Sequence, residues 1–176
     1  ELTHVVFYLS DYGRQDPKVE SGAIQSIEYA GVMAFLDQDA DLLSEVCLAL
    51  HFVGRDVPDA WMSWVQEQRE ACQMSIHPLE NNEVDDYHTF LMMEWFISEV
   101  VKRPVFESFC ERARRFIYSG SESVLRGMTM ALYAMDAEGQ RNRTGAIREM
   151  KSRLTERERT LLDHASQTIG CFDQFL

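Results

Sequence analysis

The sequence lacks the features of an all-β, a disulfide-stabilised or a membrane-spanning protein. Its 176 residues include only four prolines and nine glycines, and few runs alternate between apolar and polar residues, which disfavours an all-β fold. The four cysteines are scattered without a CxxC spacing, so we expect reduced thiols in a cytoplasmic protein. The longest apolar stretch, residues 90–101, is interrupted by Glu and Ser and is too short to span a bilayer. The first residues lack the basic region and the small-residue cleavage site of a signal peptide.

Basic side chains are scarce in the first hundred residues, which carry 19 acidic groups against four basic ones, a net charge of −15. Residues 101–176 carry 10 acidic and 13 basic groups, a net charge of +3, and the whole chain has −12. A negative total disfavours attraction of the whole surface to nucleic acid or anionic lipid, so we expect no membrane association. The charge is therefore divided along the chain into an acidic first part and a weakly basic second part.

The spacing of apolar residues predicts an all-α protein. We expect a single helical domain over residues 1–176, built as a single-core bundle of seven or eight helices. Residues 86–101 are apolar almost all round and are expected to form the central buried helix. Residues 4–9 favour a short N-terminal strand or the start of a helix, and the polar linker 75–85 is the candidate for a sub-boundary. The other expected helices cover residues 21–36, 42–52, a segment beginning near Pro58, 105–118, 124–135 and a last segment that opens with a capping box at Thr155.

The histidine and carboxylate spacings do not indicate a metal centre. A di-metal carboxylate bundle needs paired Glu-x-x-His motifs, whereas this chain has only Glu1…His4 at its beginning and Asp85…His88 at a helix start. We therefore predict neither a metal nor a cofactor. Glu94 is surrounded in sequence by bulky residues and could serve as a general acid or base, but we favour an ion pair with a later arginine. Serine nucleophile elbows, Walker loops and Rossmann glycine motifs are absent, so an enzyme is not the expected class.

One short motif suggests an enzymatic alternative. Arg159 and His164 have an Arg-x4-His spacing that is similar to the motif of HEPN-type ribonucleases, in which an arginine and a histidine from a dimer converge on an RNA phosphate. The resemblance covers six residues, and Thr160 stands where a polar Asn, Asp or His is usual. It implies ribonuclease activity with Arg159 and His164 as its residues. The structural alternative is that this segment is an amphipathic helix with its leucines in the core.

The leading functional hypothesis is a non-enzymatic interaction protein, such as a regulator, inhibitor, adaptor or immunity-type protein, which binds a protein partner through charged helical surfaces. An acidic surface attracts a basic partner and accelerates association. The candidate acidic contacts lie at helix starts and in linkers, where capping is the competing role. They are Asp37, Asp39, Asp41, Glu80, Glu83, Asp85 and Asp86.

The second hypothesis is a nucleic-acid-associated subunit of a larger complex that uses the arginine-rich second part. Arginine outnumbers lysine eleven to two after residue 100, and its planar guanidinium suits bidentate contacts with phosphate or carboxylate. Two other roles are a solvated face with local ion pairs, and neutralisation of the acidic first part within one chain or in a homo-oligomer. The candidate basic contacts are Arg112, Arg115, Arg126, Arg141, Arg143, Arg148, Lys151 and Arg153.

Overall fold

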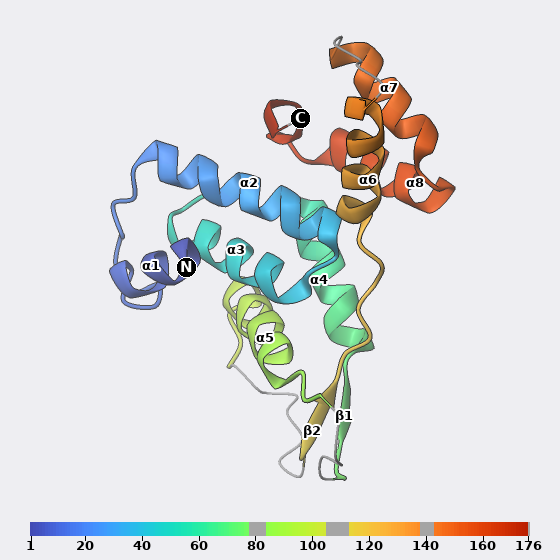
Figure 1. Cartoon of the computed structure of the whole chain (residues 1–176). Helices are drawn as coiled ribbons and strands as arrows, with labels where there is room; N and C mark the ends of the chain where they lie inside the picture. Colours follow the sequence, from blue (N-terminus) through green and yellow to red (C-terminus); the bar gives the residue numbers. More distant parts are fainter. Residues whose placement is uncertain (78–83, 105–112, 138–142, 176) are drawn as a thin grey trace.

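The computed structural model describes residues 1–77, 84–104, 113–137 and 143–175. Within these residues, the helices pack around one buried helix, α3. α3 contacts α1, α2, α4 and α5 (Figure 1). The C-terminal helices α6, α7 and α8 gather at one end of α2, and the last helix lies against α2 (Figure 1). The helices are α1 (Leu2–Leu9), α2 (Ser21–Asp37), α3 (Ala40–Phe52), α4 (Asp59–Ala71), α5 (Tyr87–Val101), α6 (Val124–Ala137), α7 (Arg143–Arg153), α8 (Glu156–Thr168) and α9 (Phe172–Phe175).

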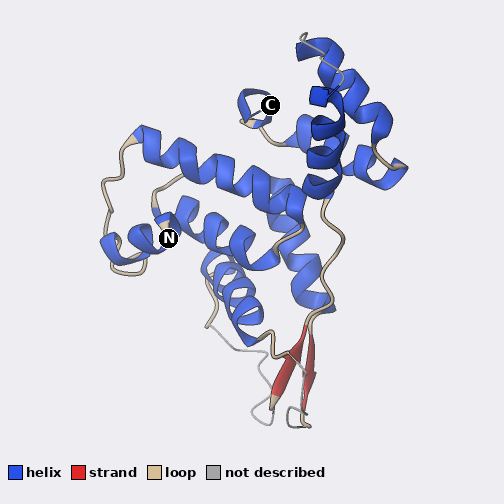
Figure 2. Cartoon of the chain, viewed as in Figure 1, coloured by secondary structure: helices blue, strands red, loops and turns tan. Residues whose placement is uncertain are grey.

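The predicted all-α fold is confirmed. The described residues form eight helices of eight or more residues, the four-residue α9 and one small sheet. Figure 2 shows how little of the chain is strand: β1 (Gln73–Ser75) pairs antiparallel with β2 (Arg115–Ile117). Residues 4–9, for which strand and helix were both open, are helical and belong to α1. Within the described residues, no helix is long and apolar enough to cross a membrane.

Local capping explains where two of the helices begin. The Asp39 carboxylate accepts a hydrogen bond from the Leu42 backbone N–H at 3.0 Å and so caps α3. At the start of α8, the Thr155 hydroxyl accepts from the Glu158 N–H at 3.3 Å, and the Glu158 carboxylate accepts from the Thr155 N–H at 2.7 Å. This is the capping box that the sequence predicted, and it satisfies two backbone donors that the helix itself cannot.

Two expectations about helices were wrong. Residues 105–118 were expected to form a helix, but residues 115–117 form β2, and 105–112 lie outside the described residues. The central helix is α3 and not α5: nine of the 13 residues of α3 are buried, against six of the 15 of α5. The difference arises because α5 packs on α3, α4 and β2 on one side and leaves Tyr87 and Val101 exposed.

The buried apolar side chains form one cluster that extends from Val6 in α1 to Phe172 in α9. The Trp61 ring of α4 packs directly on Gly31 of α2, where a Cβ atom would overlap the ring. Trp61 is fully buried, so the ring has nowhere to retreat without moving its neighbours. The cluster includes side chains from before and after the linker 75–85, such as Cys72 and Phe90.

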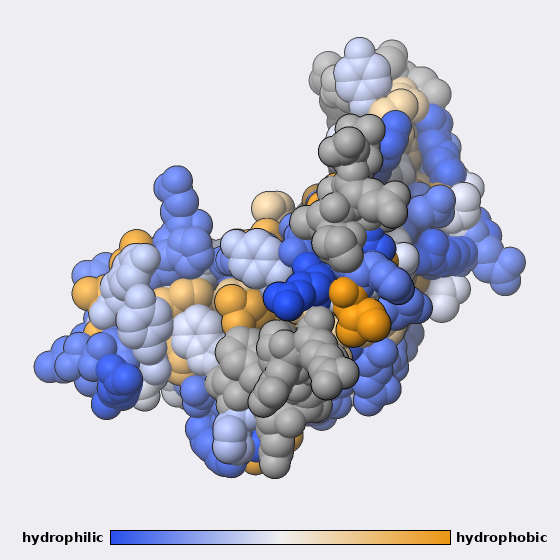
Figure 3. All heavy atoms as spheres, turned by 90° about the horizontal axis from the view of Figure 1, so that it is seen from below, coloured by the Kyte–Doolittle hydropathy of each residue, from blue (hydrophilic) through white to orange (hydrophobic). Residues whose placement is uncertain are grey.

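Large apolar side chains that remain exposed are concentrated on two helices. α1 exposes Leu2, Val5, Tyr8 and Leu9, and α6 exposes Met130, Leu132 and Tyr133. On the face seen in Figure 3, hydrophobic side chains lie in small groups between hydrophilic ones. Exposed apolar side chains are ordinary on a folded protein, because apolar atoms contribute more than half of its surface.

Candidate functional site

A hollow between α4 and α8 is lined by aromatic, acidic, hydroxyl and imidazole side chains. Two adjoining hollows, of about 710 and 740 Å³, share Leu161 and His164 of α8. The end of α2 and one face of α4 line the first hollow, and the first turns of α8 line the second. We call both together the α4–α8 groove. Its lining residues include Phe35, Gln38, Asp59, Ser63, Trp64, Glu67, Glu156, Thr160, Leu161, His164 and Thr168.

The floor of the α4–α8 groove is apolar and largely aromatic. Phe35 is buried, and its ring makes an edge contact with Trp64, the two centroids being 6.0 Å apart. The same Phe35 ring lies 6.4 Å from the His164 ring, centroid to centroid. Leu161 is only partly buried and completes the floor from the α8 side. Large rings held by packing present contact area that loses little conformational freedom on binding.

One wall of the groove is acidic. Asp59, Ser63 and Glu67 follow one another at four-residue spacing, which aligns them along one face of α4. Trp61 and Val65 point from the other face of the same helix into the core. Both carboxylates lie on exposed residues, so the α4 side of the groove is a negatively charged rim, whereas Glu156 and Arg157 both line the α8 side.

Two acidic candidates in the turn between α2 and α3 serve the fold. Asp37, the last residue of α2, accepts a hydrogen bond from the Ser123 hydroxyl just before α6. Asp39 caps α3, as described above. Capping was the competing role for Asp39, and the geometry favours it over a partner contact.

The acidic candidates near the linker hold the small sheet. The Asp85 carboxylate accepts from the Phe116 N–H at 2.9 Å, and the Asp86 carboxylate accepts from the Tyr118 N–H at 2.8 Å. Both bonds tie the start of α5 to β2 and its neighbour. The remaining two acidic candidates, Glu80 and Glu83, lie outside the described residues.

Two of the basic candidates, Lys151 and Arg153, are engaged in ion pairs within the second part of the chain. Lys151 lies 2.6 Å from the Asp163 carboxylate, and Arg153 lies 3.0 Å from the Glu149 carboxylate one turn away. Arg157 pairs with Glu122 at 3.5 Å. These pairs correspond to the local-ion-pair alternative. The acids that they use belong to the second part, so these pairs leave the charge of the acidic first part unchanged.

The other basic candidates are dispersed. Arg126 lines a hollow of about 480 Å³ between α6 and α8, which Glu122, Arg157 and Glu158 also line. Arg148 is exposed on α7, Arg143 is the first residue of that helix, and Arg115 begins β2. Arg112 and Arg141 lie outside the described residues.

Arg159 and His164 have different surroundings on α8. The Arg159 guanidinium donates to the Leu154 carbonyl oxygen at 3.0 Å and thereby supports the turn before the helix. His164 contacts Phe35 in the α4–α8 groove. The ribonuclease alternative is not tested by this geometry, whereas the amphipathic-helix description of the segment is consistent with buried Leu162 and Ala165.

Glu94 is fully buried in an ion-pair triad. The Arg69 Nε atom lies 2.6 Å from Oε2, and the Arg103 Nη2 atom lies 2.8 Å from Oε1 without the alignment of a hydrogen bond. The Arg69 guanidinium also sits 4.2 Å above the centre of the Phe90 ring. The interpretation that Glu94 pairs with a later arginine is confirmed by Arg103. Burial of an unpaired carboxylate would be unfavourable, and the two arginines compensate its negative charge.

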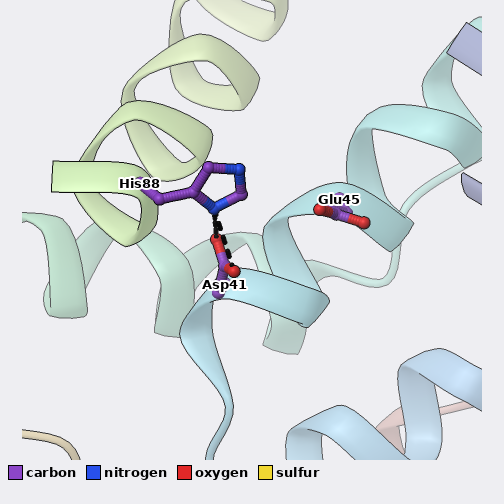
Figure 4. Close-up of side chains that lie close together, drawn as sticks. All are labelled: Asp41, Glu45 and His88. Atoms are coloured by element: carbon purple, nitrogen blue, oxygen red, sulfur yellow. Dashed lines mark hydrogen bonds and ion pairs between the residues drawn. The ribbon is translucent and has the colours of Figure 1, made fainter. Parts of the chain in front are cut away.

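A mixed cluster of carboxylates and imidazole lies where α3 meets α5. The His88 Nδ1–H donates to both Asp41 oxygens, at 2.8 and 3.0 Å, and Glu45 follows Asp41 by one turn (Figure 4). One ligand atom from each of Asp41, Glu45 and His88 lies within 4.8 Å of the others, so these three could hold a metal ion. Burial raises the pKa of Asp41, the charges of Glu45 and Asp39 raise it further, and His88 opposes them.

A family model matches residues 1–176 of the chain. The chain belongs to the DUF6902 family, which is described as a domain of unknown function. No curated protein and no solved structure matches the chain.

Proposed function

We propose that the protein is a non-enzymatic binding module that docks a basic, amphipathic helical segment of a partner protein in the α4–α8 groove. The observation that carries the proposal is the combination of an apolar floor, formed by the partly exposed Trp64 and Leu161 above the buried Phe35 ring, with an acidic rim at Asp59 and Glu67. A segment with apolar side chains on one face and lysine or arginine beside it matches both features.

Charge favours this occupant over a neutral or acidic one. The first hundred residues have a net charge of −15, and α4 belongs to them. A field of this sign raises the rate at which a basic segment meets the groove, and the effect falls as salt screens it. The apolar floor then determines how long the segment stays, because aromatic anchors dominate the energies of most interfaces.

A nucleic-acid interface has less support among the described basic residues. Lys151, Arg153 and Arg157 already face carboxylates, and phosphate would have to displace these partners. Phosphate binding also requires a contiguous basic surface, whereas Arg126 shares its hollow with Glu122 and Glu158. The groove therefore provides the stronger basis for a function.

The test measures fluorescence anisotropy of two labelled probe peptides added to the protein at 50 mM and 300 mM salt. One peptide places Leu on one face of a helix with Lys on both borders of that face, and the other contains Lys at the same positions with Ser in place of Leu. We expect the first to bind more tightly than the second, and its affinity to fall with salt. Equal binding of both peptides would show that only charge is recognised and would refute a role for the apolar floor.

Matched variants locate the contact. Asp59→Asn with Glu67→Gln removes both rim charges, and we expect about a tenfold loss of affinity at low salt, equivalent to about 1.4 kcal/mol. Glu1→Gln with Glu20→Gln removes the same charge from exposed positions outside the groove and should change the affinity less than twofold. An equal loss of peptide affinity in both double variants would refute the assignment of the contact to the groove. Self-association of the protein through the groove in the absence of peptide would refute it as well.

A further inference from the structure

We propose that Asp41, Glu45 and His88 form a binding site for a divalent transition-metal ion of the zinc type, at the junction of α1, α3 and α5. This site is independent of the α4–α8 groove and lies on a different set of helices. Spacing along the sequence did not indicate it, because His88 is 47 positions from Asp41.

The donor atoms are already close to the separation that a shared ion requires. Two ligand atoms on one tetrahedral zinc ion with bonds of about 2.0 Å lie about 3.3 Å apart. His88 Nδ1 and the nearer Asp41 oxygen are 2.8 Å apart, and the three ligand atoms lie within 4.8 Å of one another. A metal ion would take the place of the proton between His88 and Asp41, and the ligand atoms that lie farthest apart would have to approach by at most about 1.5 Å.

The third ligand, Glu45, is held in place by α1. The Thr3 hydroxyl donates to Glu45 Oε2 at 2.6 Å, and His4 Nε2 lies 3.2 Å from Oε1. Both donors resemble the outer contacts that orient metal-ligating carboxylates in proteins. Glu45 is buried, whereas His88 and Asp41 are partly exposed, so an ion could enter from solvent on the side of His88.

The composition of the site favours zinc over calcium or magnesium. One imidazole nitrogen with two carboxylates suits Zn²⁺, whereas Ca²⁺ and Mg²⁺ prefer oxygen ligands alone. Three protein ligands leave one tetrahedral position for water. A cation would also relieve the repulsion between Asp41 and Glu45, two like charges one turn apart on α3.

The test is titration of the chelator-treated full chain with ZnCl₂ by calorimetry, with CaCl₂ and MgCl₂ as comparison ions. We expect one zinc ion per chain and no comparable heat from calcium or magnesium. His88→Ala should weaken zinc binding by at least about tenfold, and Asp41→Asn should do the same. His77→Ala, which removes an exposed histidine outside the cluster, should leave the affinity unchanged.

Two further readouts keep the result independent of folding. Circular dichroism of the metal-free variants establishes that each is folded, which is expected because His88 is half exposed. Co²⁺ should give the visible absorption of a four-coordinate site in the wild type and lose it in His88→Ala. Zinc binding that survives equally in His88→Ala and Asp41→Asn, or no binding to the wild type, would overturn the proposal. Neither result would affect peptide binding in the groove.

Discussion

Replacing Glu94 by Ala should destabilise the protein by about 3–5 kcal/mol, the range observed when one partner is removed from a buried ion pair. Glu94 is fully buried between Arg69 and Arg103, whose side chains are only 13% and 25% exposed. Without the carboxylate, two largely buried positive charges face each other across a vacated space. Part of the loss is moderated because Arg69 keeps its contact with the Phe90 ring.

The assay is urea unfolding followed by helical circular dichroism at neutral pH. In a separate thermal unfolding experiment, a loss of about 3–5 kcal/mol in a chain of this length corresponds to a fall in Tm of about 6–20 °C. The slope of free energy against urea should stay unchanged, because the substitution removes little surface. Glu94→Gln keeps the volume and one acceptor oxygen, so it should lose less, about 1–3 kcal/mol.

A compensated variant separates charge from packing. Changing Glu94, Arg69 and Arg103 together to methionine removes all three charges, and it should recover most of the stability lost in Glu94→Ala. A loss below about 1 kcal/mol in Glu94→Ala would contradict the reasoning, because the triad would then contribute no more than a surface ion pair.

Three other substitutions test separate parts of the fold. Gly31→Ala should destabilise by about 1–3 kcal/mol in urea unfolding, because its Cβ overlaps the buried Trp61 ring, and a neutral result would mean that α2 can shift. His51→Gln addresses pH: burial, and then the charge of Lys102, lower the pKa of His51 in the folded state. The unfolded chain therefore binds the proton more readily, so wild-type stability falls as pH drops below the ordinary histidine pKa of about 6.5. The variant should show a smaller fall between pH 7.5 and 5.5, and identical pH curves would disprove the role of His51. Thr155→Ala removes the capping box of α8 and should cost about 1 kcal/mol, whereas Thr155→Ser should be close to wild type in the same assay.

The fold was predictable where the signal is local. The capping box at Thr155 and the helix from residue 21 were found because capping and apolar spacing act over a few neighbouring residues. Residues 115–117 were assigned to the wrong structure because their strand depends on pairing with residues 73–75, some forty positions away. Propensity within one segment does not contain that information.

The candidate sites were less predictable than the fold. Asp59 and Glu67 fall in the helix that was predicted to begin near Pro58, but their position opposite Leu161 depends on how α8 packs. Likewise, His88 was noted with Asp85, the residue three positions earlier, whereas its partner in the structure is Asp41. Sites formed between helices depend on the packing of distant segments, which one sequence alone does not give.

Amide hydrogen exchange with and without the Leu/Lys probe peptide tests the proposed function most directly, because it reports where the peptide binds. Binding in the α4–α8 groove should slow exchange in residues 59–67 and 156–168, while α1 and the β1–β2 sheet keep their rates. Protection that is confined to α6 and α7, or no protection at peptide concentrations that saturate the anisotropy signal, would contradict the account.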